Sequence, residues 1–121
     1  MSTVLVVEDN DLNRRLFVDL LGIRGHTVLE ATDGAAALEM IEAHQPDLVL
    51  MDIQLPTVSG LDVTQKIRKM TNIRQPRIVA VSAFALKQDA DKALEAGCDD
   101  YVSKPIAIGS FFETIDKNLQ S

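Results

Sequence analysis

The clearest indication of the fold of this chain comes from residues 48–56, Leu48-Val49-Leu50-Met51-Asp52-Ile53-Gln54-Leu55-Pro56. Four consecutive apolar residues without alternation are typical of a parallel strand buried on both faces. The run ends in the carboxylate of Asp52, and a proline follows shortly afterwards to turn the chain. We therefore expect Asp52 to stand at the carboxyl end of a central strand, held in place by the strand and reachable by solvent.

Four other segments have the composition of short strands, and patterns of helical period separate them. The segment 27–30 is less apolar than 48–51, which favours a place near the edge of the sheet. Alternation of strands and helices is typical of βαβ units. The sequence predicts one α/β domain, a doubly wound five-stranded parallel sheet with five helices on its two faces. The remaining strands are expected at 4–7, 27–30, 77–81 and 100–103, and the helices at about 12–21, 35–45, 59–70, 86–95 and 108–119.

Capping residues predict where some of these helices begin and end. Asn10 or Asp11 can accept hydrogen bonds from the first turn of the first helix. Gly22 or Gly25 can end this helix, and Gly97 can end the fourth helix.

The composition bounds the function. A chain of 121 residues is long enough for one domain with one core. The net charge of −6 disfavours direct nucleic-acid binding and favours cations or basic partners. The single cysteine, Cys98, cannot form an internal disulfide, and no stretch reaches the roughly 20 apolar residues of a membrane span. We expect a cytoplasmic protein without membrane insertion.

The predicted strands end in side chains that share one kind of chemistry. The carboxyl ends of parallel strands lie at one edge of the sheet, where ligands bind in such folds. Crowded carboxylates repel each other, so an oxygen-preferring divalent cation is their natural counter-ion. Mg²⁺ fits best because it binds one or two carboxylates, keeps water molecules and leaves its remaining coordination positions to phosphoryl oxygens. The residues concerned are Glu8 and Asp9, then Asp52, Ser82 and Lys104.

With these charges offset by a metal ion and by Lys104, Asp52 can act as a nucleophile towards phosphorus and carry an acyl phosphate. The hydroxyl of Ser82 can reach a phosphoryl oxygen. Each of these residues alone has a structural explanation, such as a helix cap or a solvated charge. Their joint placement at successive strand ends is what points to a site.

The whole chain, residues 1–121, resembles a response-regulator receiver domain. The resemblance rests on Glu8-Asp9 after the first strand, Asp52 after the third, Ser82-Ala83 after the fourth and Lys104-Pro105 after the fifth. It implies a five-stranded sheet of order 2-1-3-4-5. It also implies a signalling switch rather than an enzyme, catalysing only its own phosphotransfer and slow self-dephosphorylation.

The resemblance assigns the phosphoryl-transfer roles. Asp52 would accept the phosphoryl group from the phosphohistidine of a histidine kinase or a histidine phosphotransfer protein. Asp9 and Asp52 would bind Mg²⁺, with Glu8 acting through water and the backbone carbonyl of Gln54 as a further ligand. Lys104 would pair with the phosphoryl group.

The resemblance also assigns the switch. Ser82 would move towards the phosphate and Tyr101 would rotate inward behind it, which changes the surface of the fourth helix, fifth strand and last helix. A downstream effector protein would bind that surface. Gly60 and Pro105, the latter after a cis peptide bond, would have structural roles beside the site.

A finer resemblance, to single-domain receivers that control bacterial cell division, rests on several short stretches: residues 7–10, 12–13, 16–17, 19–21, 51–56, 59–61 and 83–85. Receivers fused to hybrid histidine kinases share many of these sequence motifs, so a receiver excised from a longer protein stays an alternative. We expect Gln54 and Phe84, each two residues beyond a site residue, to tune the lifetime of the acyl phosphate.

Two other classes of protein share parts of the pattern. A magnesium-dependent phosphatase with an aspartyl nucleophile, resembling the haloacid-dehalogenase group, would need an acid where Gln54 stands. A flavodoxin-like electron carrier would need a Ser-, Thr- or Gly-rich loop after the first strand, and the acidic residues 8–11 would repel the flavin phosphate.

Overall fold

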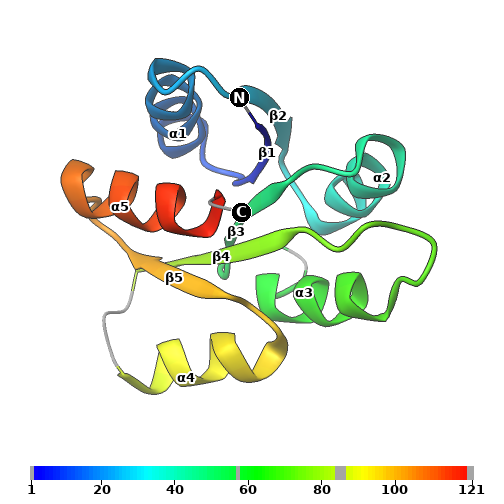
Figure 1. Cartoon of the computed structure of the whole chain (residues 1–121). Helices are drawn as coiled ribbons and strands as arrows, with labels where there is room; N and C mark the ends of the chain where they lie inside the picture. The colour runs from blue at the N-terminus through cyan, green and yellow to red at the C-terminus, as the bar shows by residue number, and fades with distance from the viewer. Residues whose placement is uncertain (1, 57, 84–86, 120–121) are drawn as a thin grey trace.

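The computed structural model describes residues 2–56, 58–83 and 87–119, and it has the predicted alternation of strands and helices (Figure 1). All strand pairs are parallel, and the order across the sheet is β2-β1-β3-β4-β5, as predicted. The elements are β1 (Thr3–Val7), α1 (Asp11–Ile23), β2 (Thr27–Ala31), α2 (Gly34–His44), β3 (Leu48–Asp52), α3 (Gly60–Lys69), β4 (Arg77–Ser82), α4 (Lys87–Ala96), β5 (Asp100–Ser103) and α5 (Ile108–Leu119).

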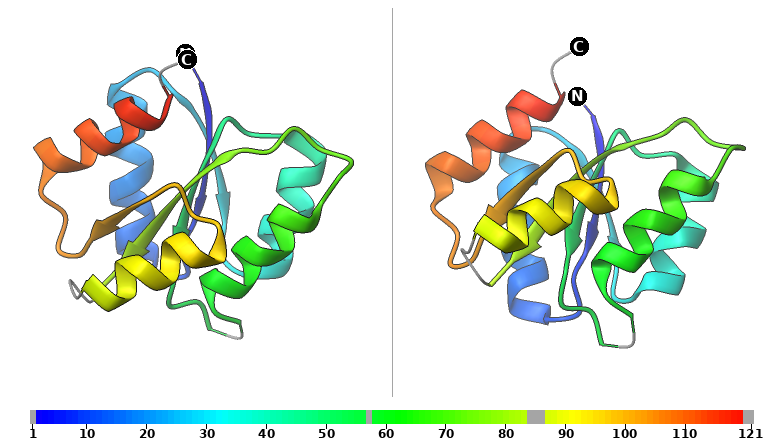
Figure 2. Two further views of the ribbon diagram at one scale, coloured as in Figure 1. Left: turned by 60° about the horizontal axis from the view of Figure 1, so that its bottom comes forward. Right: turned by 90° about the horizontal axis from the view of Figure 1, so that it is seen from below.

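The sheet lies between two layers of helices (Figure 2). Helices α1 and α5 cover one face, and α2, α3 and α4 cover the other. β3 is buried along its whole length because it has strand neighbours on both sides and helices above and below. β2 is the edge strand that its composition predicted, and within this strand Ala31 alone is fully buried.

Local capping explains where several helices begin. Asn10 accepts a hydrogen bond of 2.9 Å from the amide of Asn13, and Asp33 accepts one of 2.8 Å from the amide of Ala36. The hydroxyl of Ser59 accepts a hydrogen bond of 3.2 Å from the amide of Leu61. These side chains satisfy amides that have no partner within the first turn of a helix.

The prediction that Gly22 can end the first helix is wrong. α1 continues through Gly22 to Ile23, so Gly22 does not end it. Gly25 does, because it takes a φ of 79°, which a helix cannot continue through. Gly97, with a φ of 113°, follows α4 as predicted, and α4 runs one residue further than expected, to Ala96.

In the part of the chain that the structure describes, every helix is too short or too polar to cross a lipid bilayer.

Candidate functional site

The register of the sheet brings the predicted site residues to one edge. Val7 pairs with Met51, so Glu8 and Asp52, the next residues along each strand, are neighbours. Ser82 ends β4, the other neighbour of β3, and the amide of Lys104 donates a hydrogen bond of 2.7 Å to the Ser82 carbonyl. The turns that leave β1 and β3 lie together in the right-hand view of Figure 2.

Three carboxylates converge at this edge. Glu8, Asp9 and Asp52 each offer an oxygen atom within 4.8 Å of the others. Glu8 and Asp52 are buried, with exposed fractions of 1% and 3%, while Asp9 is exposed. The expectation that Asp52 is reachable by solvent is therefore wrong for this structure, because the central position of β3 and the overlying Lys104 cover its side chain.

Lys104 reaches back across the edge from the end of β5. Its ammonium group donates a hydrogen bond of 2.9 Å to Glu8 and lies 3.5 Å from an Asp52 oxygen. The pair with Glu8 spans 96 positions of the sequence. One cation thus balances only part of the charge of three carboxylates, which leaves the cluster short of positive charge.

Burial and the neighbouring charged groups shift the pKa values of two side chains of this site. Burial, followed by the hydrogen bond with Asp52, raises the pKa of Glu8 above its ordinary value of 4.5. Burial lowers the pKa of Lys104, but the hydrogen bond to Glu8 and the charge of Asp52 outweigh this effect, so its pKa is raised. Lys104 therefore stays protonated at neutral pH, and a further cation beside Glu8 would favour the charged form of its carboxyl group.

Two neighbours hold Asp52 and the turn that follows it. The amide of Gln54 donates a hydrogen bond of 2.9 Å to an Asp52 oxygen. Gly60 begins α3 so close to the end of β3 that a Cβ atom there would overlap the Asp52 carbonyl oxygen. The Lys104–Pro105 peptide bond is cis, as the resemblance implied.

The other predicted site residues differ in how far they are buried. Ser82 is buried at the end of β4. Tyr101 is 36% exposed on β5 and lines a surface hollow with Pro105, so in this structure its side chain is not enclosed in the core. Phe84 falls outside the described residues, and Gln54 is exposed beside the site.

Two features of α1 were not predicted from the sequence. Arg14 donates hydrogen bonds to the acidic loop, which we define as residues 8–11, and to β2. An arginine one turn after a helix cap is a common pattern, so the sequence did not single it out. Leu12, Leu16 and Ile23 are 81%, 42% and 75% exposed. Their spacing of four and seven residues places them on one stripe, and a separate helical projection of the apolar residues would have shown it.

The donor set suits Mg²⁺. The three side chains of the cluster are all carboxylates, and Mg²⁺ prefers oxygen ligands and retains several water molecules. The exposed Asp9 leaves one side of the cluster open to solvent, as such a hydrated ion needs.

Comparison with known proteins agrees with the geometry. A family model described as the response regulator receiver domain matches residues 4–116. The chain belongs to this family. This receiver domain is 44% identical over 118 residues to the polar-differentiation response regulator DivK of Brucella anthropi, covering 98% of this chain and 96% of DivK. The predicted family and its place in two-component signalling are confirmed, and the phosphatase and flavodoxin alternatives fall away.

Solved receiver domains share the fold over nearly the whole chain. The receiver domain of the sensor histidine kinase PA1611 from Pseudomonas aeruginosa, solved with a magnesium ion in its active site cleft, is 32% identical with a TM-score of 0.89, covering 99% of this chain and 98% of that one. The receiver domain of Ssk1 from Saccharomyces cerevisiae, solved with the histidine phosphotransfer protein Ypd1, is 30% identical with a TM-score of 0.86, covering 95% and 86%.

Proposed function

We propose that Asp52 is the phosphoacceptor of a magnesium-dependent signalling switch. The observation that carries the proposal is the joint geometry of the acidic cluster. Asp52 lies within 4.8 Å of two further carboxylates, and the Lys104 ammonium lies 3.5 Å from it. A carboxylate held in place by its strand, with a fixed cation beside it, suits the transfer of an anionic phosphoryl group.

The transfer is a substitution at phosphorus. A carboxylate oxygen of Asp52 forms the new P–O bond while the P–N bond to the donor histidine breaks, and the nitrogen leaves with its electron pair. Lys104 is placed to neutralise charge on the phosphoryl oxygens. Ser82, at the end of the neighbouring strand, supplies a hydroxyl for the same oxygens once the acyl phosphate has formed.

We assign the Mg²⁺ ligands to Asp9 and Asp52, with Glu8 acting through water and the backbone carbonyl of Gln54 as a further ligand. When bound, the ion supplies positive charge that offsets the carboxylates and the phosphoryl oxygens. The deficit of cations among Glu8, Asp52 and Lys104 supports this assignment. The magnesium ion in the cleft of the PA1611 receiver domain supports it independently.

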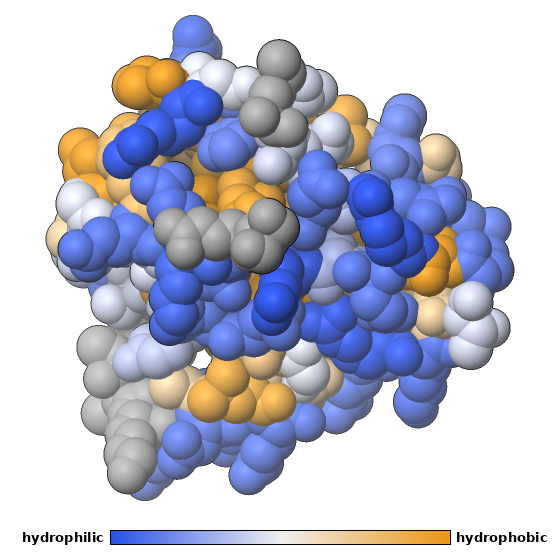
Figure 3. All heavy atoms as spheres, viewed as in Figure 1, coloured by the Kyte–Doolittle hydropathy of each residue, from blue (hydrophilic) through white to orange (hydrophobic). Residues whose placement is uncertain are grey.

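The phosphodonor is a histidine kinase or a histidine phosphotransfer protein, in keeping with the Ypd1 complex of the related Ssk1 receiver. We place its docking surface on the exposed stripe of α1, formed by Leu12, Leu16 and Ile23, because this stripe begins next to the acidic loop. Figure 3 shows hydrophobic patches on the side of the molecule where α1 and α5 lie, within a mostly hydrophilic surface.

The effector surface is assigned to α4, β5 and α5. Leu94, Tyr101 and Ile108 are exposed there, with fractions of 51%, 36% and 55%. Tyr101 also lines a hollow of about 270 Å³ between β5 and α5. Inward rotation of Tyr101 on phosphorylation would reshape this hollow, and the buried side chains of α4 are alanines, which anchor a helix weakly.

The relationship to DivK suggests a role in polar differentiation or cell division. The alternative, a receiver excised from a hybrid histidine kinase, is supported by the match to the kinase receiver of PA1611. Gln54, exposed beside Asp52, is the described residue best placed to tune the lifetime of the acyl phosphate, and Phe84 is assigned the same role from its position two residues after Ser82.

The test is phosphorylation by a small-molecule phosphodonor, followed by intact mass. Wild type with Mg²⁺ should gain one phosphoryl group, and Asp52→Asn should gain none. Asp19→Asn, an exposed aspartate on α1, is the matched control and should behave as wild type. Omission of Mg²⁺ should abolish the adduct. An adduct that persists in Asp52→Asn would refute the assignment of Asp52.

A further inference from the structure

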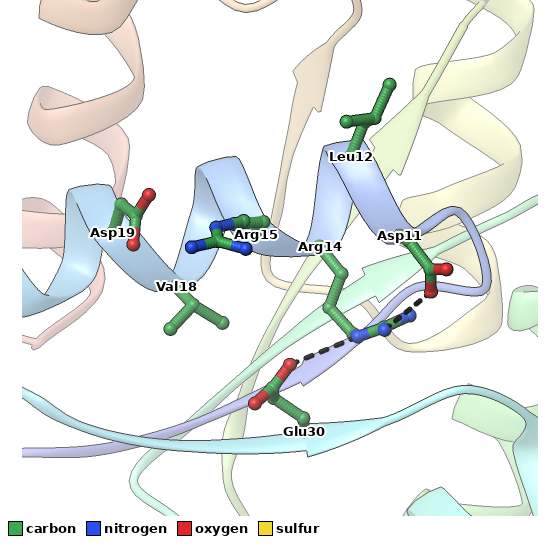
Figure 4. A pocket seen from close by; sticks show the side chains of 7 residues that line it. All are labelled: Asp11, Leu12, Arg14, Arg15, Val18, Asp19 and Glu30. Atoms are coloured by element: carbon green, nitrogen blue, oxygen red, sulfur yellow. Dashed lines mark hydrogen bonds and ion pairs between the residues drawn. The ribbon is translucent and has the colours of Figure 1, made fainter.

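Arg14, in the first turns of α1, joins three separate parts of the chain through one guanidinium group. It donates hydrogen bonds of 3.1 Å to the backbone carbonyl of Glu8, 2.7 Å to the carboxylate of Asp11 and 3.1 Å to the carboxylate of Glu30. Figure 4 shows Arg14 between α1 and β2, where it lines a hollow of about 580 Å³. Its side chain is only 17% exposed.

Two of these bonds go to the two ends of the acidic loop, residues 8–11, to which we assign the metal site. Glu8 and Asp11 lie on either side of Asp9, so a single planar group holds both ends of the segment that carries the exposed carboxylate. The Glu8 carboxylate adds an internal tie, because it accepts a hydrogen bond of 3.2 Å from the amide of Asn10. The third bond, to Glu30, anchors the arrangement to the edge strand β2.

The charge of Arg14 does not favour a cation in the cluster. A guanidinium near a divalent metal ion repels it, so an arginine that acted by charge alone would weaken metal binding. Asp11 and Glu30 each form an ion pair with Arg14 and balance its charge. What remains is geometry. The three bonds leave the three different nitrogen atoms of the planar guanidinium group, whereas all three donors of a lysine lie on one nitrogen and cannot span the same acceptors.

We propose that Arg14 is a positioning residue that holds residues 8–11 in the conformation required for Mg²⁺ binding. The proposal rests on the magnesium site assigned above. Because the loop is held before the ion arrives, less ordering is needed on binding, and the affinity for the metal rises.

The test is calorimetric titration of the whole chain with Mg²⁺, with no phosphodonor present. Arg14→Ala and Arg14→Lys should each weaken the Mg²⁺ affinity roughly tenfold, the lower end for lost outer-shell partners of a metal site. Arg15→Ala is the matched control. Arg15 is exposed on the same helix and lines the same hollow, and none of the hydrogen bonds described for Arg14 comes from it.

The sign of the effect separates geometry from charge. If Arg14 acted only as a cation, Arg14→Ala would bind Mg²⁺ more tightly and Arg14→Lys would match wild type. Either result, or an affinity for Arg14→Ala equal to that of Arg15→Ala, would overturn the proposal. If Arg14→Ala did not fold, as judged by circular dichroism, the charge-conserving Arg14→Lys would decide.

Asp9→Asn and wild type separate this inference from the proposed function. Wild-type binding that is lost in Asp9→Asn establishes the metal site, and the Arg14 variants then test the positioning role alone. Absence of Mg²⁺ binding in wild type would overturn the metal site and the role of Arg14 with it.

Discussion

Asp9 is the exposed member of an acidic cluster whose other two members are buried. In the metal-free protein its charge repels those of Glu8 and Asp52. We therefore expect Asp9→Asn to raise the free energy of unfolding by up to about 1 kcal/mol without metal, the range for partly screened charges at this separation.

With Mg²⁺ present, we expect wild type to be more stable than Asp9→Asn. Wild type should gain stability with added Mg²⁺, because the ion binds only the folded state, and Asp9→Asn should gain little. Urea denaturation with a chelator and with excess Mg²⁺ measures both effects. A metal-dependent gain in the variant equal to that of wild type would argue against Asp9 as a ligand.

Glu8 makes the stability of the metal-free protein depend on pH. Its pKa is raised in the folded state above the ordinary 4.5, so the folded protein binds this proton more tightly than the unfolded chain does. The contribution of Glu8 to stability should therefore grow as the pH falls from its raised pKa towards 4.5, and shrink as the pH rises through the raised pKa. Chelator-treated wild type and Glu8→Gln, denatured by urea across this range, should differ by that slope. Parallel curves would contradict the prediction.

At the scale of elements, the junction between β3 and α3 depends on a residue without a side chain. A Cβ atom at Gly60 would overlap the Asp52 carbonyl oxygen and lie 2.9 Å from the Ile53 Cα, so the backbone must move to admit it. We expect Gly60→Ala to destabilise the fold by about 2 kcal/mol or more and to impair phosphorylation of Asp52.

Gly22 is the matched control for the same substitution. It lies inside α1, and among the described residues no atom beyond the adjacent backbone of the helix comes within 4 Å of an added Cβ. Gly22→Ala should therefore stabilise the fold by about 0.5–1 kcal/mol through helix propensity. Thermal denaturation of the two variants should give shifts of opposite sign. A stabilising Gly60→Ala would show that the junction is looser than the contacts indicate.

At the scale of the whole molecule, one sheet supports two separate layers of core. Ile78 belongs to the layer beneath α2, α3 and α4, and Ile115 belongs to the layer beneath α1 and α5; both are fully buried. Because β1, β3 and β4 contribute side chains to both layers, loss of either layer exposes the sheet that the other one needs. We expect the two layers to unfold together.

The test compares Ile78→Ala with Ile115→Ala. Each should lower the free energy of unfolding by about 2–5 kcal/mol and retain a single transition, seen alike by circular dichroism and by Tyr101 fluorescence. Leu94→Ala, at a 51% exposed position, should change it by less than about 0.5 kcal/mol. Two separate transitions in either core variant would mean that the layers fold independently.

Much of this protein is determined by the sequence alone. The two periods of hydrophobicity, short apolar runs and helical spacing, are local properties, so they give the order of elements and hence a parallel sheet. Because parallel strands end at a common edge, the order of elements is enough to assign the acids after β1 and β3, Ser82 and Lys104 to one site.

How these groups meet depends on contacts between elements that are far apart in the sequence. The contact between Lys104 and Glu8 crosses 96 positions, and the burial of Asp52 depends on which strands flank β3. The fork of Arg14 joins α1 to β2 and to the acidic loop, and the exposure of Leu12 and Leu16 depends on how α1 lies on the sheet. A local pattern records which residues share a face, whereas strand order, register and the docking of helices set the distances between faces. Those distances determine the charge balance and the accessibility of the acidic cluster.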